Sequence, residues 1–287
     1  MTYLPQLAHL NQIADNYDAI LCDVWGVVHN GRTAFEDAVE ALRRFREMHG
    51  PVILITNAPV PVDRVTRMFP QVGVPDDCYD AVVTSGDATR AELEKRAPGP
   101  FYRIGPDYDD PLYHGLEIEF TDKVEEAACV SCTGLRKIPD DEPESYRREL
   151  TDLADRSLEM ICANPDVMYK YGDRLIWSAG ALAQIYEEIG GRVIRPGKPD
   201  APIYRLAYQK LEELMGVKVN SERILAIGDG PATDVRGAVR EGLDCLFIGG
   251  GIHGDLMDEG EDFLISAARV LENDNADAAY AAPALIW

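Results

Sequence analysis

The stretch that decides the fold is Ala19-Ile20-Leu21-Cys22-Asp23-Val24-Trp25-Gly26-Val27-Val28. Its first half has the apolar composition of a buried β-strand, and Asp23 and a turn-forming glycine follow directly. A carboxylate at this position lies at the carboxyl end of a strand, where open α/β sheets place their ligand sites. Burying it without a partner would be strongly unfavourable. We therefore expect Asp23 to have a cation beside it or a catalytic role.

Apolar runs of strand length recur along the chain and alternate with helical patterns such as 35–48 and 202–214. This alternation predicts an α/β fold with a doubly wound, Rossmann-like parallel sheet. The strands expected in this sheet are 19–24, 52–56, 81–84, 192–195, 224–227 and 244–248.

The chain has 287 residues, which suits a core domain with a large inserted domain. We expect residues 1–84 and 191–287 to form the core and residues 85–190 to form an inserted α/β cap domain. The cap has its own expected strands, at 101–104, 117–121, 128–132 and 159–163. The acidic, alanine-rich stretch 272–282 is interpreted as a frayed or late-packing tail.

The charge of the chain excludes several function classes. Asp and Glu number 50 against 28 for Lys and Arg, which gives a net charge of -22. Such a surface repels nucleic acid and anionic lipid, and no apolar run is long enough to span a membrane. The first residues do not have the pattern of a secretory signal, so we expect a cytoplasmic protein. Cys129 and Cys132 have the spacing of a redox or zinc pair, but no second pair follows, and we expect buried structural thiols.

The ends of the expected core strands carry complementary polar side chains: Asp23, Thr56, Asn57, Lys198, Asp229 and Asp234. Gathered carboxylates would repel one another unless a divalent cation neutralised them. Oxygen ligands of this kind fit Mg²⁺. Threonine and lysine would then hold the oxygens of a phosphoryl group. The set predicts phosphoryl transfer through an aspartyl-phosphate.

This arrangement resembles the haloacid dehalogenase (HAD) superfamily over nearly the whole chain. Residues 23–28 match the first motif, Ile55-Thr56-Asn57 the second, Lys198 the third, and Gly228-Asp229 with Asp234 the fourth. The insertion is similar to the type IIA cap, on the evidence of segments 83–89, 163–166 and 195–199. That subgroup includes p-nitrophenyl phosphatases, pyridoxal phosphate phosphatases and sugar-phosphate phosphatases.

The resemblance implies a set of Mg²⁺ ligands. Asp23 would attack phosphorus with one oxygen and bind the metal with the other. Trp25 would contribute its main-chain carbonyl, and Asp229 would be a direct carboxylate ligand. Asp234 would bind through a water molecule or orient the loop.

The resemblance also implies a phosphate site. Thr56 and the backbone of Asn57 would bind the phosphate, and Lys198 would pair with the nucleophile and the phosphoryl oxygens. The cap residues Asn164 and Asp166 would lie near the substrate, or would simply form an Asx-Pro turn.

Trp25 departs from the family pattern, because many of these enzymes carry an acid–base aspartate there. General acid–base catalysis contributes about 10²- to 10⁴-fold in rate, and an indole has no proton that titrates near neutral pH. Three outcomes are open: slow hydrolysis that favours good leaving groups, a proton supplied by His29 or a cap residue, or loss of hydrolysis.

We expect a Mg²⁺-dependent hydrolase of small phosphate monoesters whose partner is a small phosphorylated metabolite, with a homodimer through the cap as a further possibility. The alternative is a catalytically weak phosphate-ligand-binding or regulatory protein of the same fold. A third hypothesis is carbon–halogen cleavage. Asp229 and Asp234 argue against it, because carboxylates do not stabilise a departing halide anion.

Overall fold

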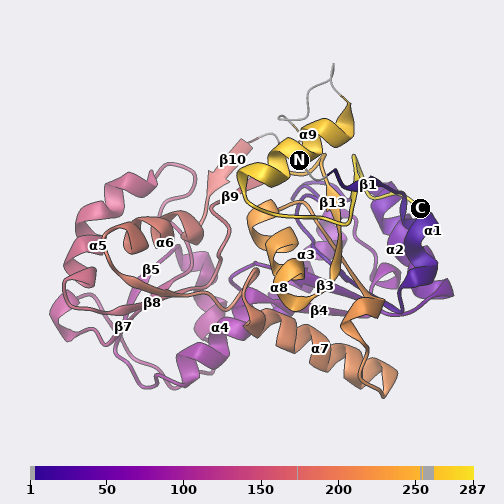
Figure 1. Cartoon of the computed structure of the whole chain (residues 1–287). Helices are drawn as coiled ribbons and strands as arrows, with labels where there is room; N and C mark the ends of the chain where they lie inside the picture. Colours follow the sequence, from indigo (N-terminus) through magenta and orange to yellow (C-terminus); the bar gives the residue numbers. More distant parts are fainter. Residues whose placement is uncertain (1–3, 173, 253, 255–261) are drawn as a thin grey trace.

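The computed structural model describes residues 4–172, 174–252, 254 and 262–287. The chain forms two lobes, each built around its own sheet (Figure 1). The larger lobe holds both ends of the chain, and every strand of the smaller lobe's sheet lies between residues 101 and 194. The cap and core limits predicted above remain an interpretation, and the sheet of the smaller lobe extends beyond the predicted cap limit of residue 190, to Ile194.

The larger sheet has the order β1-β14-β13-β12-β2-β3-β4 and is parallel throughout. The central strands are buried on both faces, as parallel strands between helical layers must be. This confirms the predicted α/β class. The strands are β1 (Gln6–Leu7), β2 (Ala19–Cys22), β3 (Val52–Thr56), β4 (Ala81–Thr84), β12 (Ile224–Gly228), β13 (Asp244–Ile248) and β14 (Tyr280–Ala282).

Helices cover both faces of the larger sheet. One face packs against α2 (Glu36–Met48) and α3 (Val62–Val72), and the opposite face packs against α7 (Ala201–Met215), α8 (Arg236–Glu241) and α9 (Phe263–Asn273). The buried stripe of α2 follows the helical period, with Ala38, Val39, Leu42 and Phe45. The shorter helical segments of this lobe are α1 (Leu10–Ile13), η1 (Ala14–Asn16), η2 (Asp76–Cys78), η6 (Ser221–Arg223) and η7 (Pro231–Val235).

The smaller sheet, also parallel, has the order β11-β8-β7-β5-β6. Helices α5 and α6 pack on one face, and α4 with η3 packs on the other. The elements are α4 (Ser85–Glu94), β5 (Phe101–Ile104), η3 (Asp107–Tyr113), β6 (Phe120–Thr121), η4 (Val124–Glu126), β7 (Cys129–Cys132), η5 (Pro143–Tyr146), α5 (Arg147–Ala154), β8 (Glu159–Cys162), α6 (Ala179–Glu188) and β11 (Arg192–Ile194).

An antiparallel hairpin of β9 (Met168–Tyr171) and β10 (Arg174–Trp177) lies between the two lobes at the top of Figure 1. The sequence analysis did not predict it. In β9, Lys170 lies between Tyr169 and Tyr171, and several side chains of the hairpin are partly exposed. This hairpin brings side chains of the inserted segment to the carboxyl end of the larger sheet.

Two details of the sequence analysis were wrong. The strand expected at 192–195 in the core sheet is β11, which pairs with β8 at the edge of the smaller sheet. The stretch 272–282 is not a frayed tail, because it continues α9 and then forms β14 between β1 and β13. The register of β14 places Ala281 and Ala282 in the core, where their small side chains fit between strands and helices.

The cysteines of the chain are buried free thiols, Cys129 and Cys132 among them. Both lie in β7 inside the smaller lobe, which agrees with a structural role. Among the described residues, no helix is both long enough and apolar enough to cross a membrane.

Candidate active site

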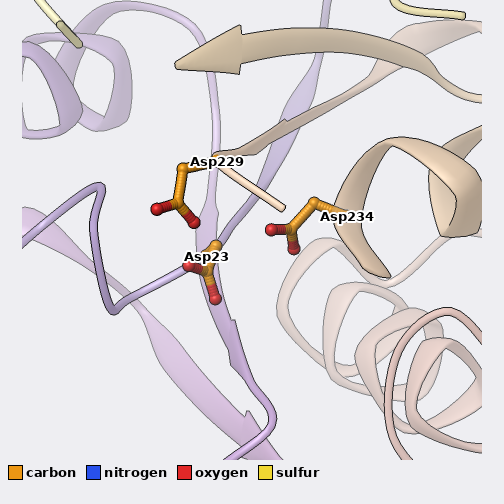
Figure 2. A group of neighbouring side chains, drawn as sticks. All are labelled: Asp23, Asp229 and Asp234. Atoms are coloured by element: carbon orange, nitrogen blue, oxygen red, sulfur yellow. The ribbon is translucent and has the colours of Figure 1, made fainter. Parts of the chain in front are cut away.

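The carboxyl ends of three neighbouring strands bring the predicted groups together. Asp23 follows β2, Thr56 ends β3 and Asp229 follows β12. Figure 2 shows the carboxylates of Asp23 and Asp229 meeting that of Asp234, which comes from the helical turn after β12. One oxygen of each carboxylate lies within 4.8 Å of the others. All of these side chains are buried.

Lys198 places its ammonium group between two of the carboxylates. Its Nζ donates to Asp23 Oδ1 at 2.5 Å, to Asp234 Oδ1 at 2.7 Å and to the carbonyl of Ile55 at 3.1 Å. The side chain is 3% exposed, so all three donors are used inside the protein. Burial disfavours the charged form, but Asp23 and Asp234 outweigh this and hold the pKa of Lys198 above its ordinary value.

Asn57 joins the Lys198 loop to the inserted segment. Its Nδ2 donates to Asp166 Oδ1 at 2.9 Å and to the Lys198 carbonyl at 3.2 Å, while its Oδ1 accepts from the Lys198 amide at 2.8 Å. Asn164 Oδ1 in turn accepts from the Asp166 amide at 3.1 Å. Asn164 and Asp166 therefore form an Asx turn that lies beside Asn57, while their contact with a substrate stays a prediction.

The pKa values of the other carboxyl groups are shifted in the direction expected for crowded anions. Burial, and then the charge of Asp234, raises the pKa of Asp229 to about 8. Burial also raises the pKa of Asp23, and Lys198 opposes that rise. A divalent cation at their centre would favour the ionised forms of these groups. The all-oxygen donor set is therefore the kind that a hard divalent metal fits.

Two glycines let the backbone close around Asp229. A Cβ atom on Gly26, whose φ is 82°, would lie 2.0 Å from Asp229 Oδ2, and a Cβ on Gly251 would lie 2.0 Å from the same oxygen. The amide of Ile252 donates to this oxygen at 2.6 Å. The sequence analysis missed the role of Gly251 in enclosing Asp229.

Asp234 lies in the π-helical turn η7, a type of turn that is frequent at functional sites. Its Oδ1 accepts from Lys198 and its Oδ2 accepts from the amide of Gly230 at 3.0 Å. Both oxygens are thus already engaged. This geometry is compatible with both roles predicted for Asp234, orientation of the loop and binding of the metal through water.

The side chain of Trp25 lies against the β9–β10 hairpin. Its ring meets Tyr169 edge-on at 5.4 Å and Tyr171 at 6.3 Å between ring centroids. On the other side it contacts His29 at 4.9 Å. Trp25 thus packs between the larger lobe and the hairpin of the inserted segment.

A cavity of ≈ 1040 Å³ lies between the lobes, and every predicted site residue lines it: Asp23, Trp25, Thr56, Asn57, Asn164, Asp166, Lys198, Asp229 and Asp234. Two further lining carboxyl groups, besides Asp23 and Asp229, have pKa values raised by burial, Asp166 to about 6 and Asp109 to about 7. Sequence reasoning missed Asp109, which lies in the acidic run 107–110 that is typical of a surface loop.

His29, one of the predicted proton sources, is fully buried. Its Nδ1 accepts from the amide of Gly31 at 2.9 Å, and burial lowers its pKa to about 4. It contacts the rings of Trp25 and Phe69 and does not belong to the described lining of the cavity. A packing role for His29 fits these contacts.

The sequence profile of haloacid dehalogenase-like hydrolases matches residues 20–119, and a HAD-hydrolase-like profile matches residues 195–273. The ribonucleotide monophosphatase NagD of Escherichia coli K12 is 26% identical over 247 residues, which are 81% of this chain and 88% of that protein. A possible sugar phosphatase of the HAD superfamily from Cytophaga hutchinsonii has the same fold, with a TM-score of 0.79, 18% identity and 99% of each chain covered.

A hydrolase of the haloacid dehalogenase-like family from Brucella suis 1330 is 43% identical, with a TM-score of 0.87. The match covers 99% of this chain and 100% of that chain. From this likeness, and from the four motifs that meet at the strand ends, the chain belongs to the haloacid dehalogenase-like hydrolase family.

Proposed function

We propose that the chain is a Mg²⁺-dependent phosphatase that hydrolyses small phosphate monoesters through an aspartyl-phosphate on Asp23. The observation that carries this proposal is the buried pair of Asp23 and Lys198, with Asp229 and Asp234 beside it, at one point of a large cavity. Relatives named as phosphatases, including a p-nitrophenyl phosphatase from Archaeoglobus fulgidus, support the reaction class.

In the first step, an oxygen of Asp23 attacks phosphorus and the bond from phosphorus to the leaving oxygen breaks. Lys198 holds Asp23 in position and offers positive charge to the phosphoryl oxygens. Thr56 and the backbone of Asn57 bind the same phosphoryl group at the end of β3. In the second step, water attacks phosphorus and releases Asp23 as a carboxylate, which is a good leaving group.

The metal would be held by Asp23, Asp229 and the main-chain carbonyl of Trp25, with Asp234 contributing through water. When bound, Mg²⁺ supplies charge neutralisation for the crowded carboxylates and the phosphoryl group. The closing of Gly26 and Gly251 around Asp229 supports its assignment as a fixed ligand.

The test is release of p-nitrophenolate from p-nitrophenyl phosphate in the presence of Mg²⁺. We expect Asp23→Asn to lose activity by at least roughly 10³-fold, as removal of a nucleophile does. Asp63→Asn is the matched control, because Asp63 lies on α3 in a surface pair with Arg67. Equal rates for wild type and Asp23→Asn would refute the proposal.

Trp25 favours a second candidate, a protein that binds a phosphorylated ligand and turns it over negligibly. An indole replaces the acid–base group of the family at the site itself. This candidate predicts that phosphorylated compounds raise the melting temperature with no phosphate released. Brisk hydrolysis of any monoester would exclude it.

A further inference from the structure

Aromatic side chains line part of the cavity that holds the proposed phosphate site, and we call them the aromatic wall. We define it as Trp25, Tyr108, Tyr169 and Tyr171, which line the same cavity as Asp23 and Lys198. Trp25 comes from the larger lobe, and the three tyrosines come from η3 and β9 of the inserted segment. Met168 lines the cavity beside them. The wall thus offers aromatic side chains, inclined to one another, to whatever is attached to the phosphate.

Contacts on both sides fix the wall in place. A Cβ on Gly31 would lie 2.4 Å from the Trp25 ring, so the turn after the first motif packs closely on the indole. Tyr169 meets the indole edge-on, and the guanidinium of Arg32 lies 5.6 Å from the centroid of Tyr171. An aromatic surface that is already ordered loses little entropy when it binds a ring.

The same tryptophan limits the chemistry. Trp25 supplies no proton to the leaving oxygen, so that oxygen departs as an anion unless another group in the cavity protonates it. An alkoxide is a poor leaving group without a general acid, whereas a phenolate of low pKa departs unassisted. The cavity therefore combines a surface for a ring with a demand for a stabilised leaving anion.

We propose that the substrates are phosphate esters of phenols or heteroaromatic alcohols, with the ring against the aromatic wall. This inference rests on the proposed phosphatase function. Asp23 forms the new bond to phosphorus, the bond to the aryl oxygen breaks, and its electron pair leaves on that oxygen as an aryl oxide. Water then attacks the phosphorus of the aspartyl-phosphate, and its proton passes to solvent or to the phosphate product.

The first experiment separates the ring from the leaving group. It compares kcat/KM for p-nitrophenyl phosphate (ring, good leaving group), acetyl phosphate (good leaving group, no ring), a ribonucleoside 5′-monophosphate (ring, alkoxide) and glycerol phosphate (neither). We expect p-nitrophenyl phosphate to be the best substrate and the two alkyl esters to be slower by about 10²- to 10⁴-fold. Comparable rates for the alkyl esters would overturn the inference while leaving the phosphatase proposal intact; hydrolysis of none of the four would refute the phosphatase proposal.

The second experiment measures log(kcat/KM) against the pKa of the phenol for substituted phenyl phosphates. Wild type should show a steep slope, Trp25→Phe the same slope, and Trp25→Asp a shallower one, because the carboxyl group can protonate the leaving oxygen. A shallow wild-type slope that becomes steep in Asp109→Asn would assign the proton to Asp109 and overturn the inference.

The third experiment tests the wall itself. Tyr169→Leu should raise KM for aryl phosphates roughly 2- to 10-fold, the range expected for one aromatic contact, and leave acetyl phosphate unchanged. Phe120→Leu is the matched control, because it removes a similar edge-on contact with Tyr113, at 5.0 Å, on β6 of the smaller lobe. An equal effect of both variants, or an effect of Tyr169→Leu on acetyl phosphate as large as on aryl phosphates, would overturn the role of the wall.

Discussion

Replacing Lys198 with methionine tests the electrostatic design of the site, because it removes the cation and keeps most of the volume. Lys198 donates to Asp23, to Asp234 and to the Ile55 carbonyl, and it is buried. Removing one partner of a buried ion pair costs about 3–5 kcal/mol of stability. Two charge-assisted hydrogen bonds at roughly 1.5–3 kcal/mol each lead to the same range. We therefore expect Lys198→Met to lower the free energy of unfolding by about 3–5 kcal/mol and to abolish turnover.

The loss of stability in Lys198→Met should increase with pH. Lys198 opposes the rise that burial imposes on the pKa of Asp23, so its removal raises that pKa further. The folded state then binds a proton that the unfolded state has released, and stability falls as pH rises. The destabilisation by Lys198→Met should accordingly be larger at about pH 8 than at about pH 6.

The assay is equilibrium unfolding in guanidinium chloride without metal, with the double variant Lys198→Met/Asp234→Asn as the control. Since the two side chains share a hydrogen bond, their effects should not add, and a coupling energy of about 0.5–3 kcal/mol is expected. The reasoning is refuted if Lys198→Met unfolds within about 0.5 kcal/mol of wild type, the change typical of a surface substitution.

Three further predictions concern the groups around this pair. Mg²⁺ at about 100 times its dissociation constant should stabilise the wild type by about 2.7 kcal/mol, and Asp229→Asn should lose this stabilisation. Thermal unfolding with and without chelator measures the difference. Gly26→Ala should also lose the stabilisation by Mg²⁺, because the new Cβ would collide with Asp229. Gly216→Ala is the control: its φ is 70° and nothing lies within 4 Å of its Cβ, so this variant should bind metal normally. Equal metal binding by the two variants would contradict the close packing around Asp229. Burial raises the pKa of Asp109 from 3.8 to about 7, so the folded state binds the extra proton and wild-type stability falls as pH rises through that window. Relative to wild type, Asp109→Asn should gain up to roughly 4 kcal/mol between about pH 4 and about pH 8, and a pH-independent difference in unfolding free energy would disprove the burial argument.

The site could be predicted from sequence because topology determines it. Once the apolar runs are assigned to one parallel sheet, the carboxyl ends of neighbouring strands share an edge, and Asp23, Thr56 and Asp229 must meet there. The position of Lys198 needed the family pattern as well, because a lysine on a short loop has no periodicity that indicates burial.

The features that the sequence analysis mispredicted or missed depend on tertiary contacts, which local sequence does not encode. The Arg-Val-Ile run of β11 indicates a strand but not which of two sheets it joins. The Tyr-Ala-Ala of β14 has no β-branched residue and is a strand because β1 and β13 flank it. Asp109 is one of three aspartates in the segment Asp107-Tyr108-Asp109-Asp110, and its burial follows from the packing of η3 against the smaller sheet.

The contact of Trp25 with Tyr169 and Tyr171 has a spectroscopic consequence. Trp25 lies in the larger lobe and the two tyrosines lie on the hairpin between the lobes, so a movement of the hairpin away from the larger lobe would separate the rings and bring water to the indole. The emission spectrum of Trp25 would then move to longer wavelength, and a ligand that draws the lobes together would reverse the change. The fluorescence of Trp25 would therefore report on this movement, and it can be measured by itself once Trp177 and Trp287 are replaced by phenylalanine.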